Sequence, residues 1–517
     1  MKTSNYKKNL TIYTLIISSN LFWFFLGLGK AGNSLLNLDQ KIMLLTSTKM
    51  NYFNLNAFEA AWNHHTSPIF YIFKLTFLIS EYLNIEFGFY VLYSFLLLLI
   101  NFVLFQICYK LTKNKYLSFV LAACFIFDLS SATVSDYILF DNRTIGILFQ
   151  CIILNYSLKI IENENRYYVF IFSIASFFQI VFLESYIISC GLIFFYLLST
   201  YDNKYELCKI FFSTNITLLT LFIGFLYLNS ELIETLNINY VFHIDAIGFN
   251  SIQKIEFAYL LNYGLFKSWG INKIFHIMTI LFMILFFYRK KIIIKNVLIE
   301  KYYGFINFYF LAEILHLFIT GPRFVNYLQI ILLFQYLIIF ISIFFIQKYF
   351  RLRLNLINLL TTLFLIILFL VMQFDYVVNK RTSLLDNSYL EANKLNTPTE
   401  EVSKYLYEDG KPELILAWIS VDSWENIYFK TNKLPSTRMW WWFHMKYIEN
   451  IYSWTEGRYY NSNLEEIFLN DLSYEKPKYA IIERGVPSPP NFYNKYIETN
   501  FSFITEIENY LIYKYKN

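Results

Sequence analysis

Charged side chains are scarce in this chain. They account for 16% of its 517 residues, whereas hydrophobic residues account for 56% and aromatic residues for 21%. A soluble protein of this size would not carry so many long apolar runs, so the composition predicts that a lipid bilayer surrounds most of the chain. The net charge of +5 does not indicate nucleic-acid binding, because Lys and Arg cluster in short loops between apolar runs, as membrane topology requires.

Motifs for nucleotide, zinc and hydrolase chemistry are missing as well. The sequence has no glycine-rich phosphate loop, no CxxC pair, no HxxxH pattern and no nucleophile elbow. Its five cysteines all lie in or at the ends of apolar runs, which excludes a disulfide framework in the polar C-terminal part. A membrane enzyme without a nucleotide-binding motif should use an activated substrate that is already in the membrane.

The apolar runs predict an α-helical polytopic membrane protein with about eleven transmembrane helices. The first run, 10–29, is expected to be an uncleaved helix, with a signal peptide as the alternative. The run 67–80 is too short to span and is expected to be a juxtamembrane or re-entrant helix. The other expected spans are 87–109, 116–134, 145–160, 167–183, 184–200, 209–229, 273–288, 302–319, 325–347 and 355–374.

The distribution of Lys and Arg predicts the orientation. The basic residues concentrate in the N-terminal segment and in every second loop, which favours a cytoplasmic position for those loops. Residues 289–291 and 348–353 are the strongest examples. An odd number of spans then places the C-terminus on the other side. We therefore expect a multi-pass protein of the plasma membrane with a cytoplasmic N-terminus and an extracytoplasmic C-terminal segment.

The chain changes character at about residue 375. Short apolar runs at 413–419, 479–482 and 510–513 are bounded by Pro, Gly, Asn or Lys, which is typical of strands. Helical stretches are expected near 400–408 and 463–471. We therefore expect a small extracytoplasmic α/β domain over 375–517, large enough to fold alone. It follows a transmembrane module over 1–374, whose first outside loop, 31–86, contains the juxtamembrane helices.

The first outside loop holds an acid and a histidine pair. Asp39 comes soon after the first apolar run, and the sequence Trp-Asn-His-His-Thr-Ser-Pro follows at 62–68, with His64 and His65 at its centre. Asp39 fits a general base, which must lie within hydrogen-bond reach of the hydroxyl that it deprotonates. The alternative is a solvated loop carboxylate or a helix N-cap, because Asp is favoured there.

Further charged residues are expected at the same membrane face. Asp136, Asp141 and Arg143 lie in the next outside loop, and Arg suits a phosphate because its planar fork donates two hydrogen bonds at once. Solvation of a helix end is the alternative interpretation of this loop. Glu184 interrupts a long apolar run, either as a substrate ligand or as a polar residue in a tight turn.

Another charged group belongs to the expected span 302–319 and its outer end. Glu313 and His316 share a helix face at a spacing of three residues, which favours a structural pair. Arg323 and Tyr327 follow just beyond the span. Arg323 either extends harmlessly to the membrane interface or holds a lipid phosphate.

These features together resemble the GT-C class of membrane glycosyltransferases, in particular the branch with the protein O-mannosyltransferases and the aminoarabinose transferase that acts on lipid A. Asp39 and the His64–Pro68 segment match that branch's acid and its Pro-containing element in the first outside loop, and Arg323 to Tyr327 is similar to its late Arg-x-x-His-Tyr element. The sequence departs from the pattern at Gln40, at Ser67-Pro68 and at Asn326. These departures concern phosphate binding and any metal requirement.

The resemblance implies an inverting glycosyltransferase. Its donor would be a sugar on a polyprenyl phosphate, and its acceptor a hydroxyl of a lipid, glycan or protein, deprotonated by Asp39. No cofactor is implied beyond a divalent metal, for which Asp39 and Asp141 would be the ligands. The residues implied in binding the donor phosphate or the substrate are His64, His65, Asp136, Asp141, Arg143, Glu184, Arg323 and Tyr327.

Two other classes of protein share part of this pattern. A polysaccharide polymerase or ligase also has many spans and a long outside loop, but it would lack the large C-terminal domain. A transporter or glycolipid flippase would carry broken helices and charges near the middle of the membrane. Glu313 and His316 are the clear example of such charges in this sequence.

Overall fold

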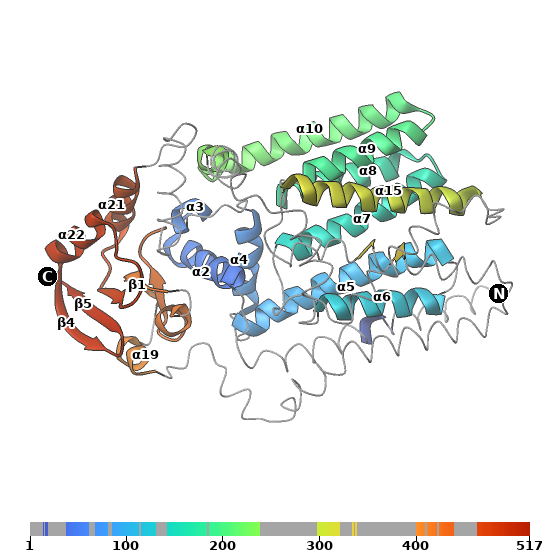
Figure 1. The fold of residues 1–517 in the computed structure, drawn as a ribbon. Helices are drawn as coiled ribbons and strands as arrows, with labels where there is room; N and C mark the ends of the chain where they lie inside the picture. The colour runs from blue at the N-terminus through green and yellow to red at the C-terminus, as the bar shows by residue number, and fades with distance from the viewer. Residues whose placement is uncertain are drawn as a thin grey trace. The chain divides into compact units, whose positions relative to one another are not determined.

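The structure is a computed structural model, mostly helical with one small sheet near the C-terminus (Figure 1). It describes residues 14, 16–18, 38–61, 68–80, 85–112, 115–130, 142–182, 186–237, 297–320, 333–334, 337–338, 400–408, 411–420, 423–438 and 463–516. The chain forms two compact units. The helical unit comprises 1–37, 83–221 and 255–386, and the α/β unit comprises 38–82, 222–254 and 387–517.

Long helices in the described part of the chain lie where the apolar runs predict spans. They are α5 (Ile85–Thr112), α6 (Lys115–Ser130), α7 (Asn142–Glu162), α8 (Arg166–Phe182), α9 (Ile187–Thr200), α10 (Lys204–Leu228) and α15 (Val297–Thr320). The expected spans 273–288 and 355–374 lie outside the described residues, and 10–29 and 325–347 do so except at a few positions. The total of eleven therefore stays a prediction.

Three of the described helices have the length and apolar composition of membrane spans: Val91–Thr112, Thr144–Glu162 and Lys204–Leu228. The third, in α10, leaves large apolar side chains uncovered, including Phe212, Ile216 and Leu221. Such a continuous apolar surface is unfavourable in water, whereas it matches the hydrocarbon of a bilayer.

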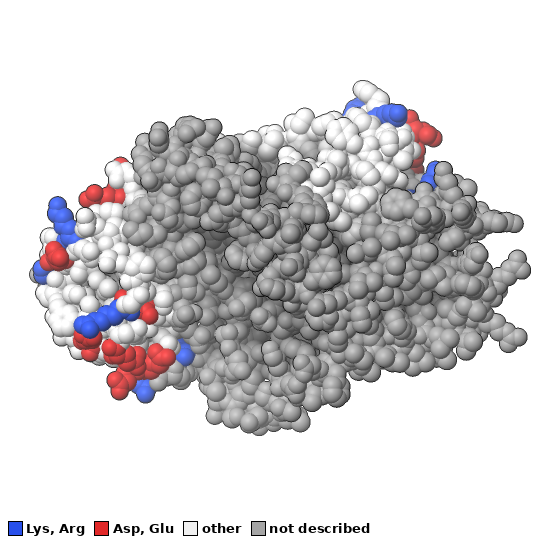
Figure 2. Space-filling view, in the orientation of Figure 1, with Lys and Arg blue, Asp and Glu red and all other residues white. Residues whose placement is uncertain are grey.

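Three loops that the charge pattern assigns to one side meet at one end of the helical unit. Lys110 at the end of α5 forms an ion pair with Glu162 at the end of α7, with Nζ and Oε2 2.5 Å apart. The backbone N–H of Asp202 donates to Glu164 Oε1 at 2.9 Å, which joins the α7–α8 turn to the α9–α10 turn. Arg166 also pairs with Glu206. Figure 2 shows charged side chains gathered on these turns and an uncharged surface beyond them.

The C-terminal part folds as the expected α/β arrangement. Its sheet contains β1 (Glu413–Trp418), β2 (Lys433–Pro435), β3 (Tyr479–Glu483), β4 (Phe501–Ile507) and β5 (Tyr510–Tyr515) in the order β2-β1-β3-β5-β4. The first three strands are parallel, and β5 pairs antiparallel with both β3 and β4. The helices of this part are α19 (Glu401–Leu406), η8 (Glu425–Phe429), α21 (Leu464–Tyr474) and α22 (Asn491–Asn500).

The expected first outside loop contributes to the α/β unit rather than standing apart from it. It forms α2 (Leu38–Phe53), α3 (Ala57–Ala60) and α4 (Pro68–Ser80). Phe58 of α3 is 1% exposed and belongs to the core beneath the sheet. That core also contains Leu416, Trp418, Phe468, Leu472, Ala480, Tyr493, Ile497 and Phe501. The first loop and the C-terminal strands therefore share one hydrophobic core.

Candidate functional site

The structure places the backbone of two predicted site residues. Asp39 is the second residue of α2, and Arg143 is the second residue of α7. Both residues thus begin helices, a position that favours Asp but not Arg through the helix dipole. Their side chains lie outside the described part of the structure, as do the other predicted residues: His64, His65, Asp136, Asp141, Glu184, Arg323 and Tyr327. Their convergence on one site stays a prediction.

Helix α2 is held firmly through its middle. Ser47 is buried and its Oγ donates to the carbonyl oxygen of Phe70 in α4 at 3.0 Å. Thr46 and Thr48 donate instead to carbonyls one turn earlier in their own helix, which satisfies their hydroxyls without a distant partner. Helix α2 therefore offers a fixed support for the residue at its start.

A buried glutamate that the sequence did not single out joins α3 to α4. Glu231 is 0% exposed, and its Oε1 accepts hydrogen bonds from the backbone N–H of Ala57 and from the hydroxyl of Tyr71, both at 2.9 Å. Burial, together with the nearby charge of Glu231, raises the pKa of Tyr71 well above its usual range. The only signal in the sequence is an acid directly after a long apolar run, and nothing local connects it to partners 160 and 174 residues away.

Glu59 has a structural role that is clear from its contacts. Its Oε2 accepts from the backbone N–H of Asn56 at 3.0 Å, and the Asn56 side chain accepts from the Glu59 N–H at 2.9 Å. This reciprocal pair is a capping box for α3. Glu59, which lies in the same loop as Asp39, therefore fixes the start of α3.

A second charged group links α2 to the C-terminal helix α21. Arg438 binds Asp471 through its backbone N–H at 2.7 Å and through its Nε at 2.9 Å. Lys49 is 2% exposed and lies near this pair. Burial lowers the pKa of Lys49 to about 8, more than the charge of Asp471 raises it. Burial raises the pKa of Asp471, against the opposing charges of Arg438 and Lys49.

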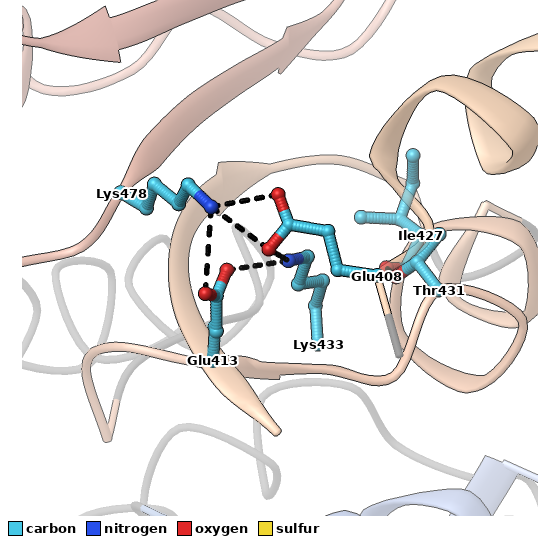
Figure 3. A network of polar contacts seen from close by, with 6 residues as sticks. All are labelled: Glu408, Glu413, Ile427, Thr431, Lys433 and Lys478. Atoms are coloured by element: carbon cyan, nitrogen blue, oxygen red, sulfur yellow. Dashed lines mark hydrogen bonds and ion pairs between the residues drawn. The ribbon is translucent and has the colours of Figure 1, made fainter. Parts of the chain in front are cut away.

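The positive charge of a second buried lysine, Lys433, is fully balanced by neighbouring carboxylates. Lys433 Nζ lies 2.6 Å from Glu413 Oε2 and 3.3 Å from Glu408 Oε2 (Figure 3). Lys478 completes the ring with bonds of 2.7 and 2.8 Å to Glu408. Burial alone would raise the pKa of Glu408, but the two lysines lower it to about 2. The two lysines and the two glutamates balance one another's charge within this ring. The ring therefore stabilises the sheet edge and leaves no net charge for a ligand.

Replacing the two buried lysines should change stability in opposite directions. The charge of Asp471 offsets the burial of Lys49 only in part, so Lys49→Met removes an incompletely compensated buried charge. We expect stabilisation by up to about 3 kcal/mol at pH 7, since one pKa unit corresponds to 1.36 kcal/mol. Lys433→Met should destabilise, because it leaves two carboxylates short of a partner.

The pH dependence follows from the sign of the Lys49 shift. Between pH 8 and 10.5 the unfolded chain binds more protons than the folded one, so wild-type stability rises with pH there. The advantage of Lys49→Met is thus full below pH 8 and is lost towards pH 10.5. Thermal unfolding of the full-length protein, followed by tryptophan fluorescence at pH 7 and pH 10, measures both effects. An equal loss of stability in both variants would contradict this account of Lys49.

The expected Glu313–His316 pair is not formed. Neither carboxylate oxygen of Glu313 has a hydrogen-bond partner. The imidazole of His316 instead packs against the ring of Tyr186, with ring centroids 4.4 Å apart. A spacing of three residues on one helix face was therefore not sufficient to pair these two side chains, because the imidazole packs against the ring of Tyr186 instead.

Comparisons with known proteins give structural likenesses but no family. No known protein family matches the chain, and no curated protein does. Among solved structures, the oligosaccharyltransferase of Archaeoglobus fulgidus, crystallised in complex with zinc and sulfate, is similar at 10% sequence identity and a TM-score of 0.48. The alignment covers 91% of this chain and 68% of that chain.

Proposed function

We propose that this chain is an integral membrane glycosyltransferase. It moves a sugar from a polyprenyl-phosphate donor to a hydroxyl acceptor on the outer face of the membrane. The observation that carries the proposal is the place of Asp39 at the start of α2, in the same compact unit as the C-terminal sheet. An acid at the start of a helix in a polar unit, in a chain that also carries helices of bilayer length, suits a reaction between a lipid-linked donor and a polar acceptor.

In the proposed reaction, Asp39 accepts the proton of the acceptor hydroxyl while that oxygen attacks the anomeric carbon of the sugar. The bond between that carbon and the lipid phosphate breaks, the configuration inverts, and the negative charge passes to the departing phosphate. Fixed positive charge at the phosphate stabilises this transition state. We assign that role to His64, His65, Arg143 and Arg323, and contacts to the substrate to Asp136, Asp141, Glu184 and Tyr327.

The contacts of α2 and α3 support a rigid base. Ser47 ties α2 to α4, and Phe58 anchors α3 in the core of the sheet. A general base must be held within hydrogen-bond reach of its substrate, and rigid elements hold it better than free loops. The C-terminal domain would thus serve the reaction by supporting the first loop, whether or not it also binds the acceptor.

A divalent ion is an optional part of the proposal. Asp39 and Asp141 are the acids that would hold it, and it would stabilise charge on the donor phosphate. Across the residues that the structure describes, no three His, Cys, Asp or Glu side chains come together as a ligand group. No step of the proposed reaction depends on such an ion.

Mass spectrometry of cell-surface products tests the proposal. In a strain that lacks the gene for this chain, lipids, polysaccharides and exported proteins should lose one defined sugar mass, and expression of the wild-type chain should restore it. The molecule that regains the mass identifies the acceptor. An unchanged profile in all three fractions would contradict the proposal and would favour a transporter instead.

A further inference from the structure

A buried polar cluster lies inside the helical unit. Its centre is Glu313 of α15, which is 0% exposed. Gln150 of α7 and Ser189 of α9 are its neutral polar neighbours. Among the described residues, the titratable groups whose charges interact with the Glu313 carboxylate are Tyr186, which directly precedes α9, Cys190 of α9 and Tyr309 of α15.

Many polar atoms of this cluster lack a hydrogen bond. Both oxygens of Glu313 and both polar atoms of the Gln150 amide are buried and make no hydrogen bond of standard geometry, and the same holds for Ser176 Oγ and Tyr309 Oη. Gln150 and Ser189 nevertheless lie close enough to Glu313 to act on its carboxylate as hydrogen-bond donors. Each such group costs about 1–3 kcal/mol in a protein interior. Other buried polar atoms of the described helical unit also lack a hydrogen bond, but Glu313 carries the only carboxylate among them, and the carboxylate is what distinguishes this cluster.

The cluster also lacks a compensating positive charge. No described Lys or Arg acts on the Glu313 carboxylate. The side chains of Cys190, Tyr186 and Tyr309 are neutral when protonated and negative when deprotonated. They therefore cannot balance the negative charge of the Glu313 carboxylate. His316 lies on the same helix, but its ring packs on Tyr186. An ionisable side chain inside a helix bundle of bilayer length typically marks a path or site for ions.

We propose that Glu313 is the centre of a buried binding site for one monovalent cation, completed by the side chains of Gln150 and Ser189. One carboxylate balances one positive charge, and carboxylate, amide and hydroxyl oxygens are hard ligands that suit a proton or an alkali metal ion. Glu313 belongs to the helical unit and Asp39 to the α/β unit, and the proposed site does not depend on sugar transfer. Its occupant enters either as a proton from bulk water or as an alkali ion, and the experiment separates these sources.

Thermal unfolding of the full-length protein in detergent tests the site. The unfolding temperature is measured at rising Na⁺ or K⁺, with N-methylglucamine chloride keeping the ionic strength constant, and separately across pH. Binding to the folded state alone stabilises it by mass action. The unfolding temperature of wild type should therefore rise to a plateau as the concentration of Na⁺, K⁺ or H⁺ increases. Glu313→Gln, a neutral isostere, should show no such rise. Glu164→Gln, in an exposed turn of the same unit, should behave as wild type.

Infrared spectroscopy separates the two sources. A carbonyl band of a protonated carboxyl that is present in wild type and absent in Glu313→Gln assigns the site to a proton. A carboxylate band that shifts on addition of Na⁺ or K⁺, together with the plateau in unfolding temperature, assigns it to an alkali ion. His316→Asn should leave either signal in place.

Three results would overturn the inference. The first is a wild-type unfolding temperature independent of pH and of both ions, with an unshifted carboxylate band. The second is the same ion dependence in Glu313→Gln as in wild type. The third is loss of the signal in His316→Asn with Glu313 intact, which would assign the charge to the imidazole. If Glu313→Gln does not fold, Glu313→Asp, which keeps the charge, is compared with wild type by the same two measurements.

Discussion

Asp39→Asn should reduce sugar transfer by about 100- to 10,000-fold, the contribution that a positioned general base typically makes. The amide has nearly the same shape as the carboxylate but cannot accept the acceptor's proton. Because the proton moves only in the transition state, kcat should fall while the KM for both substrates stays nearly constant. The rate of appearance of the product mass, in membranes that contain equal amounts of each variant, measures the effect.

A matched substitution controls for general damage. Asp202→Asn makes the same chemical change at an exposed residue in the turn between α9 and α10, and its transfer rate should equal that of wild type. Asp39→Glu keeps a base but moves it by one methylene, so an intermediate rate is expected. If Asp39→Asn keeps a rate within about threefold of wild type, well short of the loss expected for a general base, Asp39 is not the base.

Phe58→Ala should destabilise the α/β unit by about 3–5 kcal/mol, the usual loss for a fully buried aromatic residue. Phe58 is 1% exposed in the core that contains Trp418, Phe468 and Tyr493. Its removal leaves a cavity beneath the sheet and takes away the apolar contact between the first loop and the C-terminal strands. Urea unfolding of the full-length protein, followed by intrinsic tryptophan fluorescence, to which the buried Trp418 contributes, measures the change.

Two further variants serve as references for the size of this stability change. Phe58→Leu refills most of the space and should recover a large part of the lost stability. Phe503→Ala removes the same ring from an exposed position on β4 and should have little effect. Should Phe58→Ala unfold at the wild-type urea concentration, the shared core would not contribute to the stability of the unit.

Local patterns predicted the elements of this fold well. The apolar runs at 413–419, 479–482 and 510–513 match β1, β3 and β5 within three residues, and the short run at 67–80 forms α4. These succeed because an apolar run bounded by polar breakers is a property of neighbouring residues. The strand β4 was missed although four of its seven residues are apolar, and β2 was missed because it has three residues only.

The contacts that organise the candidate site were beyond local reasoning. Glu231 binds Ala57 and Tyr71 across more than 150 residues, and Phe58 enters a core formed by residues 416–501. The type and spacing of neighbouring side chains do not predict such long-range partners. The histidine pair, the acids of the second loop and the late Arg323 are residues of the right chemistry in the right order, and their spatial arrangement stays a prediction.

The shared core has a consequence for the order of synthesis. A ribosome makes Phe58 early, whereas its core partners lie between Leu416 and Phe501, so α3 lacks this core until most of the chain has been translated. Domains usually fold as units while the chain emerges, but this one must wait for its last strands. A chain interrupted before β1 therefore leaves Phe58 and the first loop without the core that residues 416–501 provide.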